Sequence, residues 1–496
     1  MKIRSFRNSR QRLFYWALAL GLLAAVMSAS TVTVYAQSLP PTAVDPGPRP
    51  GPQPGNGAGN PIAGLPADQV QFWIDGLILF GETVSVKGTV PNEPLLGLGP
   101  AFNGNSCLLC HSQPAIGGSA PPSNPQIGIA NLDGATNHIP TFLTANGPTL
   151  EVRFLRNADG TVDGGVHDLF TITGRSDAPA GCALKQPDFA TALANGNVAF
   201  RIPIPTFGEG FVENVTDDAM NANLAAQGVV KAALGIKGRF NHSGNDGTTT
   251  RFGWKAQNKF MLMFSGEASN VELGISNELF NNERTNGGCA TNATPEDNTH
   301  VIIPTGGNAG DDASQISSLI ENFTIFMRLN APAQPCDFFT SGTSCQPLGA
   351  AALRGKALFG TVVLPGTGAP NTGIGCVLCH TDQLTTAKSN LTPLSKVNFN
   401  PFSDFALHHM GAGLADGISQ GQAGIDEFRT APLWGAGQRV FFMHNGQTSN
   451  IVTAIALHAS PCTTGQVCSE ANAVVAAFNA LTPQQQADLV TFLRSL

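Results

Sequence analysis

The chain has 496 residues, a formal net charge of −7 and only 12% charged residues. This balance offers no basic surface, so we expect no nucleic acid partner. The 56 glycines and 34 prolines favour a globular fold that is rich in loops and turns.

The amino terminus has the pattern of an export signal. Basic residues at positions 2, 4, 7, 10 and 12 precede an apolar run over residues 13–29, and Ala36 ends a small-residue cleavage site. We therefore predict a signal peptide over residues 1–36 and export to the periplasm. The apolar run is close to the shortest length that spans a bilayer, so an uncleaved membrane anchor is the alternative.

Residues 37–67 form a tract that is rich in proline and glycine and has few side chains able to build a core. This composition predicts an extended linker. Helical periodicity begins at Asp68, a residue type that caps helices, and continues through Trp73 and Phe80.

Two copies of Cys-x-x-Cys-His, the attachment motif of c-type haem, are the most specific feature of the sequence. Each cysteine of such a motif binds one haem vinyl group, and the histidine binds the iron. A zinc site would need further ligands nearby, and a thiol redox pair would not need the histidine. We therefore predict two covalently bound c-type haems. Their attachment and ligand residues are Cys107, Cys110, His111, Cys376, Cys379 and His380.

The six remaining cysteines should form three disulfides, because export and haem attachment place the protein in an oxidising compartment. Short spacing along the chain suggests two local pairs, and elimination suggests the third, although six cysteines allow other connectivities. The expected pairs are Cys336–Cys345, Cys462–Cys468 and Cys182–Cys289.

A faint internal repeat precedes the two haem motifs. Residues 76–81 read Gly-Leu-Ile-Leu-Phe-Gly, and residues 355–360 read Gly-Lys-Ala-Leu-Phe-Gly. Each copy combines an apolar helix end with a glycine loop, which suggests two related cytochrome c units. We predict a mostly α fold with two cytochrome c-like haem domains and loop-rich insertions. The N-terminal domain would cover residues 68–335 and the C-terminal domain residues 336–496.

Four longer stretches carry a more specific signal: residues 97–103 (GLGPAFN), 405–417 (FALHHMGAGLADG), 427–435 (EFRTAPLWG) and 443–446 (MHNG). These stretches resemble the di-haem oxidoreductase family, whose members are described as peroxidases. The resemblance extends over essentially the whole chain after the leader. The family is in turn distantly similar to bacterial di-haem cytochrome c peroxidases.

The more distant similarity implies a catalytic residue. Those peroxidases carry an Arg-Ala pair, fourteen further residues and a Val-Glu-Met-Gly segment, whose glutamate works beside the peroxide-binding haem. Here a Lys-Ala pair begins at Lys255, and the similar segment at the same spacing contains Glu272. The resemblance therefore implies that Glu272 is the general acid/base, which moves the proton of a bound peroxide. The alternative is a solvated helix residue. Lys255 stands where the peroxidases have arginine, and a lysine cannot make the bidentate contact that an arginine can make.

The distal iron ligands are less sharply indicated. In the peroxidases a methionine that follows an Ala-Val helix binds the second haem, and His458 stands at the similar place here. We predict His458 as the distal ligand of the C-terminal haem. Met410 is the alternative, with His408, His409 and His444 behind it.

The first haem has no obvious distal histidine, and His138 and His167 are the candidates. An open distal face would admit peroxide. Trp254 is interpreted as a core residue, with a position between the haems as the alternative. The resemblance also implies a possible Ca²⁺, for which Thr430 and Asn103 offer oxygen ligands.

Together these features predict an exported di-haem oxidoreductase that reduces hydrogen peroxide at the N-terminal haem. The resemblance implies that a small cytochrome c or cupredoxin donates electrons through the C-terminal haem. A di-haem electron carrier and a haem oxidase of an organic substrate are the alternatives. Residues 150–335 exceed what a carrier needs, which favours an enzyme.

The paired motifs predict that both haems stay on the polypeptide. Extraction with acidified acetone should leave all of the colour on the protein, because thioether bonds resist this treatment. The mass should exceed that of the mature chain by two haems. Haem in the solvent phase, or the added mass of one haem only, would show that the motifs are not both attachment sites.

Overall fold

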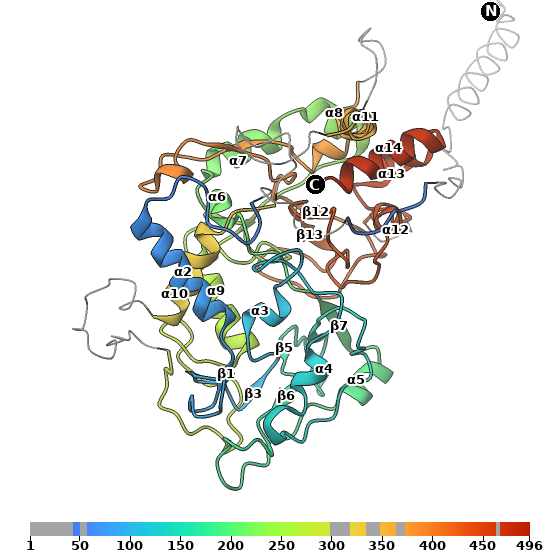
Figure 1. Cartoon of the computed structure of the whole chain (residues 1–496). Coiled ribbons are helices and arrows are strands. Elements are labelled where there is room, and N and C mark those ends of the chain that lie inside the picture. Colours follow the sequence, from blue (N-terminus) through green and yellow to red (C-terminus); the bar gives the residue numbers. More distant parts are fainter. Residues whose placement is uncertain (1–42, 50–56, 298–317, 334–347, 364–372, 463–466) are drawn as a thin grey trace, which may run out of the picture. The chain divides into compact units, whose positions relative to one another are not determined.

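Short helices joined by long irregular segments build the protein (Figure 1). The computed structural model describes residues 43–49, 57–297, 318–333, 348–363, 373–462 and 467–496. These residues belong to one compact unit. The predicted signal peptide, residues 1–36, and the predicted pair Cys336–Cys345 lie outside them.

The helices fall into two groups along the chain. Those before residue 300 are α2 (Ala67–Gly81), α3 (Cys107–Cys110), α4 (Gln126–Ile129), α5 (Phe189–Ala194), α6 (Glu209–Glu213), α7 (Asp217–Ala225), α8 (Gly228–Leu234) and α9 (Met261–Glu272). Those after it are α10 (Leu319–Leu329), α11 (Ala350–Phe359), α12 (Ile451–Leu457), α13 (Asn472–Asn479) and α14 (Pro483–Leu493). Short 3₁₀ turns cover Leu132–Gly134, Cys376–Leu378 and Thr392–Leu394.

The strands are two to four residues long and pair in small sheets. The two-stranded sheets are β1 (Val84–Ser85) with β2 (Leu95–Leu96), β3 (Ala101–Phe102) with β6 (Phe170–Thr171), β8 (Asn241–His242) with β9 (Thr249–Thr250), β10 (Leu384–Thr385) with β11 (Asn398–Phe399), and β12 (Leu407–His409) with β13 (Glu427–Arg429). In the three-stranded sheet β4 (Glu151–Phe154) lies between β5 (Val166–His167) and β7 (Val198–Arg201).

The prediction of a mostly α fold holds only in part. Of the residues that the structure describes, 30% are helical and 12% lie in strands, so irregular segments dominate this part of the chain. Apolar periodicity predicted helices correctly where one helix packs on another. In the glycine- and proline-rich segments, the backbone N–H and C=O groups form their hydrogen bonds in turns and with side chains instead.

The internal repeat corresponds to two similar helix crossings. α2 packs on α10 and α11 packs on α14. A Cβ at Gly76 would lie 2.6 Å from the carbonyl oxygen of Asn322, and one at Gly355 would lie 2.0 Å from that of Asp488. Only glycine therefore lets the two helices of each pair approach this closely. The phenylalanine near the end of each first helix then lies beside the histidine of the next haem motif.

Two large apolar cores and one small cluster lie within the described part of the compact unit. The larger core contains Phe102, Phe207 and Phe326, and the smaller core contains Phe359 and Phe492. Parts of the chain after residue 336 also belong to the larger core, among them Leu384, Phe399 and Trp434. The boundary between the predicted haem domains at residues 335 and 336 stays a prediction.

Parts of the predicted linker contact the folded unit. Ala58 and Ile62 are buried in the larger core, and the side chain of Asp45 is 2% exposed. A few anchoring residues hold these parts in place. The prediction of a linker missed them, because it used the average composition of the tract and not its single residues. The described parts of residues 37–67 are therefore docked rather than free.

The cysteine pairing agrees with the sequence where the structure describes it. The sulfur atoms of Cys182 and Cys289 lie at disulfide distance, 2.14 Å, and those of Cys462 and Cys468 at 2.05 Å. The first pair joins segments 107 residues apart. Among the described helices, none is both long and apolar enough to cross a membrane.

The helix crossing at Gly355 can be tested by Gly355→Ala. The added methyl group has no space beside Asp488, so the free energy of unfolding should fall by about 1–3 kcal/mol. Urea-induced unfolding measures the change. Gly228→Ala is the matched control, because no atom lies within 4 Å of that position at the start of α8. A neutral or stabilising effect of Gly355→Ala would contradict the close crossing.

Candidate functional site

The first haem motif opens onto a cavity in the N-terminal part of the unit. α3 carries Cys107 and Cys110, and His111 follows as its C-cap. All three line the cavity. The ring of Phe80, from the end of α2, lies 6.1 Å from the ring of His111 in an edge-on arrangement. The helix crossing at Gly76 thus positions an aromatic wall beside the histidine.

His111 is held in the form that an iron ligand requires. Its Nδ1 donates a hydrogen bond to the carbonyl oxygen of Gly118 at 3.0 Å, so the proton is on Nδ1 and Nε2 keeps its lone pair. Burial lowers the pKa of His111 to about 4. The imidazole is therefore neutral at physiological pH and able to bind a metal.

Glu272 lines the same cavity as His111. It is the last residue of α9, and its backbone carbonyl accepts hydrogen bonds from the backbone N–H groups of Asn103 and Gly104 at 2.8 and 3.1 Å. These bonds fix the helix end beside the segment that leads into the first haem motif. Burial, and after it the negative charge of Glu151, raises the pKa of Glu272 to about 8.

The described lining of the first cavity holds a single histidine. Among the described residues that line it, His111 is the only histidine. The two predicted candidates lie elsewhere: His138 is exposed, and His167 stacks on Phe154 with ring centres 3.8 Å apart. Neither is placed to ligate a group held by His111.

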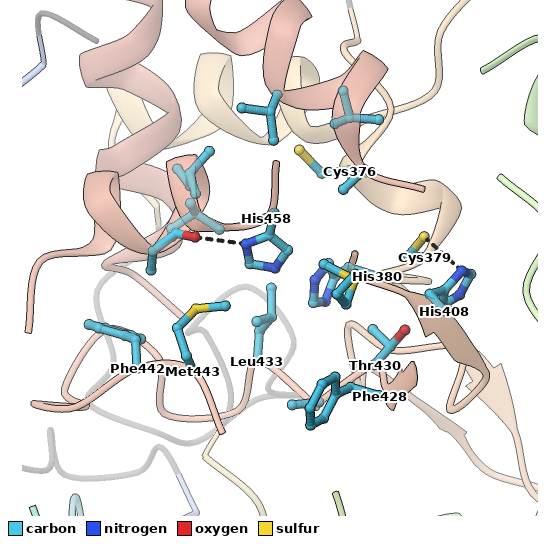
Figure 2. A pocket seen from close by; sticks show the side chains of 18 of the residues that line it. Cys376, Cys379, His380, His408, Phe428, Thr430, Leu433, Phe442, Met443 and His458 are labelled. Carbon is cyan, nitrogen blue, oxygen red and sulfur yellow. Dashed lines mark hydrogen bonds between the residues drawn. The ribbon is translucent and has the colours of Figure 1, made fainter. Parts of the chain in front are cut away.

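The second haem motif lines a separate cavity, together with the end of α12 (Figure 2). The arrangement of Phe80 beside His111 recurs here, since the Phe359 ring lies 6.4 Å from the ring of His380. His380 Nδ1 donates to the carbonyl oxygen of Phe402 at 2.8 Å, and burial lowers the pKa of His380 to about 4. Its Nε2 is therefore the free ring nitrogen.

His458 faces His380 across this cavity (Figure 2). The ring centres are 6.4 Å apart. Two imidazoles that bind one metal ion from opposite sides, at about 2 Å per bond, have ring centres roughly 6 Å apart. His458 Nδ1 donates to the carbonyl oxygen of Ala454 at 2.7 Å, which again leaves Nε2 free. The pair can hold one iron between them.

The alternative ligands are less well placed. Met410 lines the second cavity, and its backbone N–H donates to the carbonyl oxygen of Asp426 at 2.9 Å. His408 is held between Asp404 at 3.1 Å and Glu470 at 2.7 Å, so both of its ring nitrogens are engaged.

The remaining two histidines have other partners as well. His409 hydrogen-bonds Asp426 at 3.1 Å. His444 stacks on Phe428 with ring centres 4.3 Å apart. His458 is therefore the candidate that the geometry favours.

Two buried arginines make the second cavity suitable for a group with carboxylates. Arg429 and Arg439 both line it. Nε and Nη2 of Arg429 and Nη2 of Arg439 have no hydrogen-bond partner among the described residues, and burial lowers the pKa of Arg439 to about 10. Buried guanidinium groups normally bind anions. The propionate groups of a haem have the required charge, so the cavity fits this cofactor.

Trp254 lines both cavities. Its Nε1 donates to the carbonyl oxygen of Ile202 at 2.9 Å, and its ring lies edge-on to His444 at 6.4 Å. Trp254 is a buried core residue that also contributes to the walls of both cavities. The interpretation as a core residue and the alternative of a position between the two sites are therefore compatible.

Lys255, next to Trp254, is fully buried and does not line either cavity among the described residues. Its ammonium group donates to the carbonyl oxygens of Gly424 and Glu427 at 2.8 and 2.9 Å. It lies 3.2 Å from Asp416, which also pairs with Arg201 of the first cavity. Burial lowers the pKa of Lys255 to about 8. Lysine at this position thus binds the C-terminal loops.

The predicted calcium ligands do not form an evident site. Asn103 accepts a hydrogen bond from the N–H of Leu169 and donates to the carbonyl oxygen of Val271. Thr430 lines the second cavity. Their surroundings differ, and bound calcium stays a prediction.

Sequence reasoning missed Arg429, Arg439 and the role of Lys255. Arg429 stands inside one of the resembling stretches, so that motif was a usable signal. β12 and β13 bring two such stretches together, with Leu407 opposite Arg429 and His408 opposite Phe428. The sequence gives no comparable signal for Arg439, because a buried guanidinium nitrogen without a hydrogen-bond partner is visible only in the folded chain.

Comparison with known proteins supports a di-haem protein. The profile of the family described as "Di-haem oxidoreductase, putative peroxidase" matches residues 151–496. A crystal structure of a MauG-like protein associated with microbial copper homeostasis is 18% identical, with a TM-score of 0.23. That match covers 36% of this chain and 52% of the other, and a likeness of this extent carries no argument about fold. No curated protein matches the chain.

Replacement of Lys255 by methionine tests the buried charge network. Methionine fills a similar volume but leaves Asp416 with one cation fewer, and removal of one partner of a buried pair costs roughly 3–5 kcal/mol. Urea-induced unfolding should show a loss of this size. Lys259→Met, which breaks an exposed pair with Asp246, should change stability little. Equal effects of the two substitutions would contradict a structural role of Lys255.

Proposed function

The chain belongs to the di-haem oxidoreductase family, and we propose that it is an exported peroxidase with two covalently bound c-type haems. It would reduce hydrogen peroxide at the N-terminal haem, with electrons from a small cytochrome c or cupredoxin that pass through the C-terminal haem. The observation that carries this proposal is the difference between the cavities. The second has two facing histidines, whereas the described lining of the first has one histidine and the carboxyl group of Glu272.

The haem-binding residues follow from the two motifs. Cys107 and Cys110 would attach the first haem, with His111 as its iron ligand. Cys376 and Cys379 would attach the second. The bound iron supplies the redox chemistry, and the protein determines which ligands reach it.

His380 and His458 would hold the second haem between them. His380 and His458 each direct Nε2 into the cavity, because their Nδ1 atoms donate to backbone carbonyls. A haem held by two histidines would supply electron transfer and would not bind a substrate. The buried guanidinium groups of Arg429 and Arg439 would hold the propionates and keep them dry.

The first cavity supports chemistry on a small substrate. His111 would bind from one side, and no histidine among the described lining residues competes for the other. Glu272 would accept the proton of peroxide and return it to the departing oxygen. A pKa of about 8 lets this carboxyl group both gain and lose a proton near neutral pH.

Glu272→Gln tests this role. Glutamine keeps the size and much of the hydrogen bonding but cannot take up a proton. Peroxide turnover by the reduced protein should fall by at least about a hundredfold, with unchanged haem content and spectra. Only the ionised carboxylate accepts a proton, so the wild-type rate should rise as the pH increases through about 8. The variant should lack this rise.

Glu278→Gln provides the control, since Glu278 is exposed and is the next glutamate along the chain. It should turn over peroxide like the wild type. If Glu272→Gln stays within a factor of about three of wild type, the proton-transfer role belongs to another residue. Glu267, which also lines the first cavity, would then be tested. A wild-type protein without peroxide turnover would favour the carrier or the oxidase.

A further inference from the structure

Asp45 anchors residues 43–49 to the C-terminal part of the chain. Its carboxylate receives hydrogen bonds from Nε and Nη2 of Arg494 at 2.8 and 2.5 Å. The side chains of Asp45 and Arg494 are 2% and 4% exposed. Burial alone would raise the pKa of Asp45, but the hydrogen bonds from Arg494, Ile451 and Gly47 together lower it. The pair is therefore ionised at neutral pH.

The same carboxylate reaches the first residue of α12. Oδ2 of Asp45 accepts a hydrogen bond from the backbone N–H of Ile451 at 2.7 Å. The first N–H groups of a helix lack partners within the helix, and a negative charge at this end is favourable. His458 follows the last residue of the same short helix. Asp45 and His458 thus stand at opposite ends of one element.

Arg494 extends the contact to the wall of the second cavity. Its Nη1 lies 3.5 Å from the carbonyl oxygen of Ala436 and 3.2 Å from that of Arg439. Its guanidinium group lies 5.3 Å from the centre of the Phe442 ring. All three of these residues line the cavity. The ion pair therefore contacts both α12 and the loop that carries Arg439.

A second backbone contact continues this arrangement. Arg49 donates its backbone N–H to the carbonyl oxygen of Gly437 at 2.9 Å, and its side chain reaches the carbonyl oxygen of Leu496 at 3.3 Å. Ala43 donates to the side chain of Gln486 at 3.2 Å. Contacts at both ends of residues 43–49 show that the whole segment, not Asp45 alone, lies along the C-terminal part.

We propose that residues 43–49 act as a strap that positions the distal side of the second haem. Asp45 is the positioning residue, because it holds the N-terminus of the helix that presents His458. The proposal rests on the proposed ligation of this haem by His458. Loss of the Asp45 charge leaves Arg494 buried without a counterion and α12 without this cap, so His458 should leave the iron more often.

Cyanide capture measures how often the distal position opens. Cyanide binds a ferric haem only when the distal position is free, so its binding rate at the second haem reports release of His458. Asp45→Asn, in the full-length protein with both haems, should speed capture about fivefold or more, the effect expected for loss of a helix cap. The low-spin signal of the second haem in electron spin resonance should decrease, with no change at the first haem.

Arg354→Gln is the matched control. It breaks an ion pair with Asp488 on α14, the helix that precedes Arg494, but Arg354 is 57% exposed and does not line the cavity. Cyanide capture should keep its wild-type rate. Equal acceleration by Arg354→Gln and Asp45→Asn would overturn the strap, because general loosening would then explain both. If Asp45→Asn does not accumulate, Asp45→Glu should give a smaller acceleration.

His458→Ala separates the strap from the ligation on which it rests. This variant should bind cyanide at the second haem without the delay caused by His458. An unchanged rate would show that His458 is not the ligand and that the proposed ligation is wrong. Fast capture in His458→Ala with a wild-type rate in Asp45→Asn would overturn the strap alone.

Discussion

Hydrogen bonds from imidazole Nδ1 to backbone carbonyl oxygens determine how both cavities can work. His111, His380 and His458 each make one. Such a bond fixes the tautomer and the ring orientation, so that Nε2 is presented to the cavity. The carbonyls belong to loops or to the histidine's own helix, and these must themselves be held in place. The irregular segments of this protein are therefore part of the site.

The helices supply that support. α2 and α11 cross their partners at Gly76 and Gly355, which brings Phe80 and Phe359 to the haem-motif histidines. The two halves share this arrangement but differ in what faces the histidine. A second imidazole faces the histidine in one cavity and a carboxyl group lines the other, and the different roles that we propose for the two cavities rest on this difference.

The interior charges explain how a chain with only 12% charged residues is organised. Lys255, Asp416 and Arg201 form a buried network next to Trp254, between the parts that line the two cavities. Arg494 and Asp45 form another at the second cavity. Buried pairs of this kind contribute little net stability but are costly to break, so they fix one arrangement of the loops.

The sequence by itself determined the two haem motifs, the helices around the repeat and the cysteine pairs that the structure describes. It also named Glu272 and His458, because spacing along the chain and resemblance to a family point to single positions. Only the tertiary structure decided that guanidinium nitrogens of Arg429 and Arg439 are buried without a hydrogen-bond partner among the described residues. It also decided that Lys255 binds C-terminal loops and that Asp45 caps the helix of His458. Asp45 and Ile451 are 406 positions apart in the sequence. Asp45 also lies in a proline- and glycine-rich tract, whose composition does not indicate that one carboxylate anchors it. Contacts at such separation arise from the packing of the whole chain, which local periodicity does not encode.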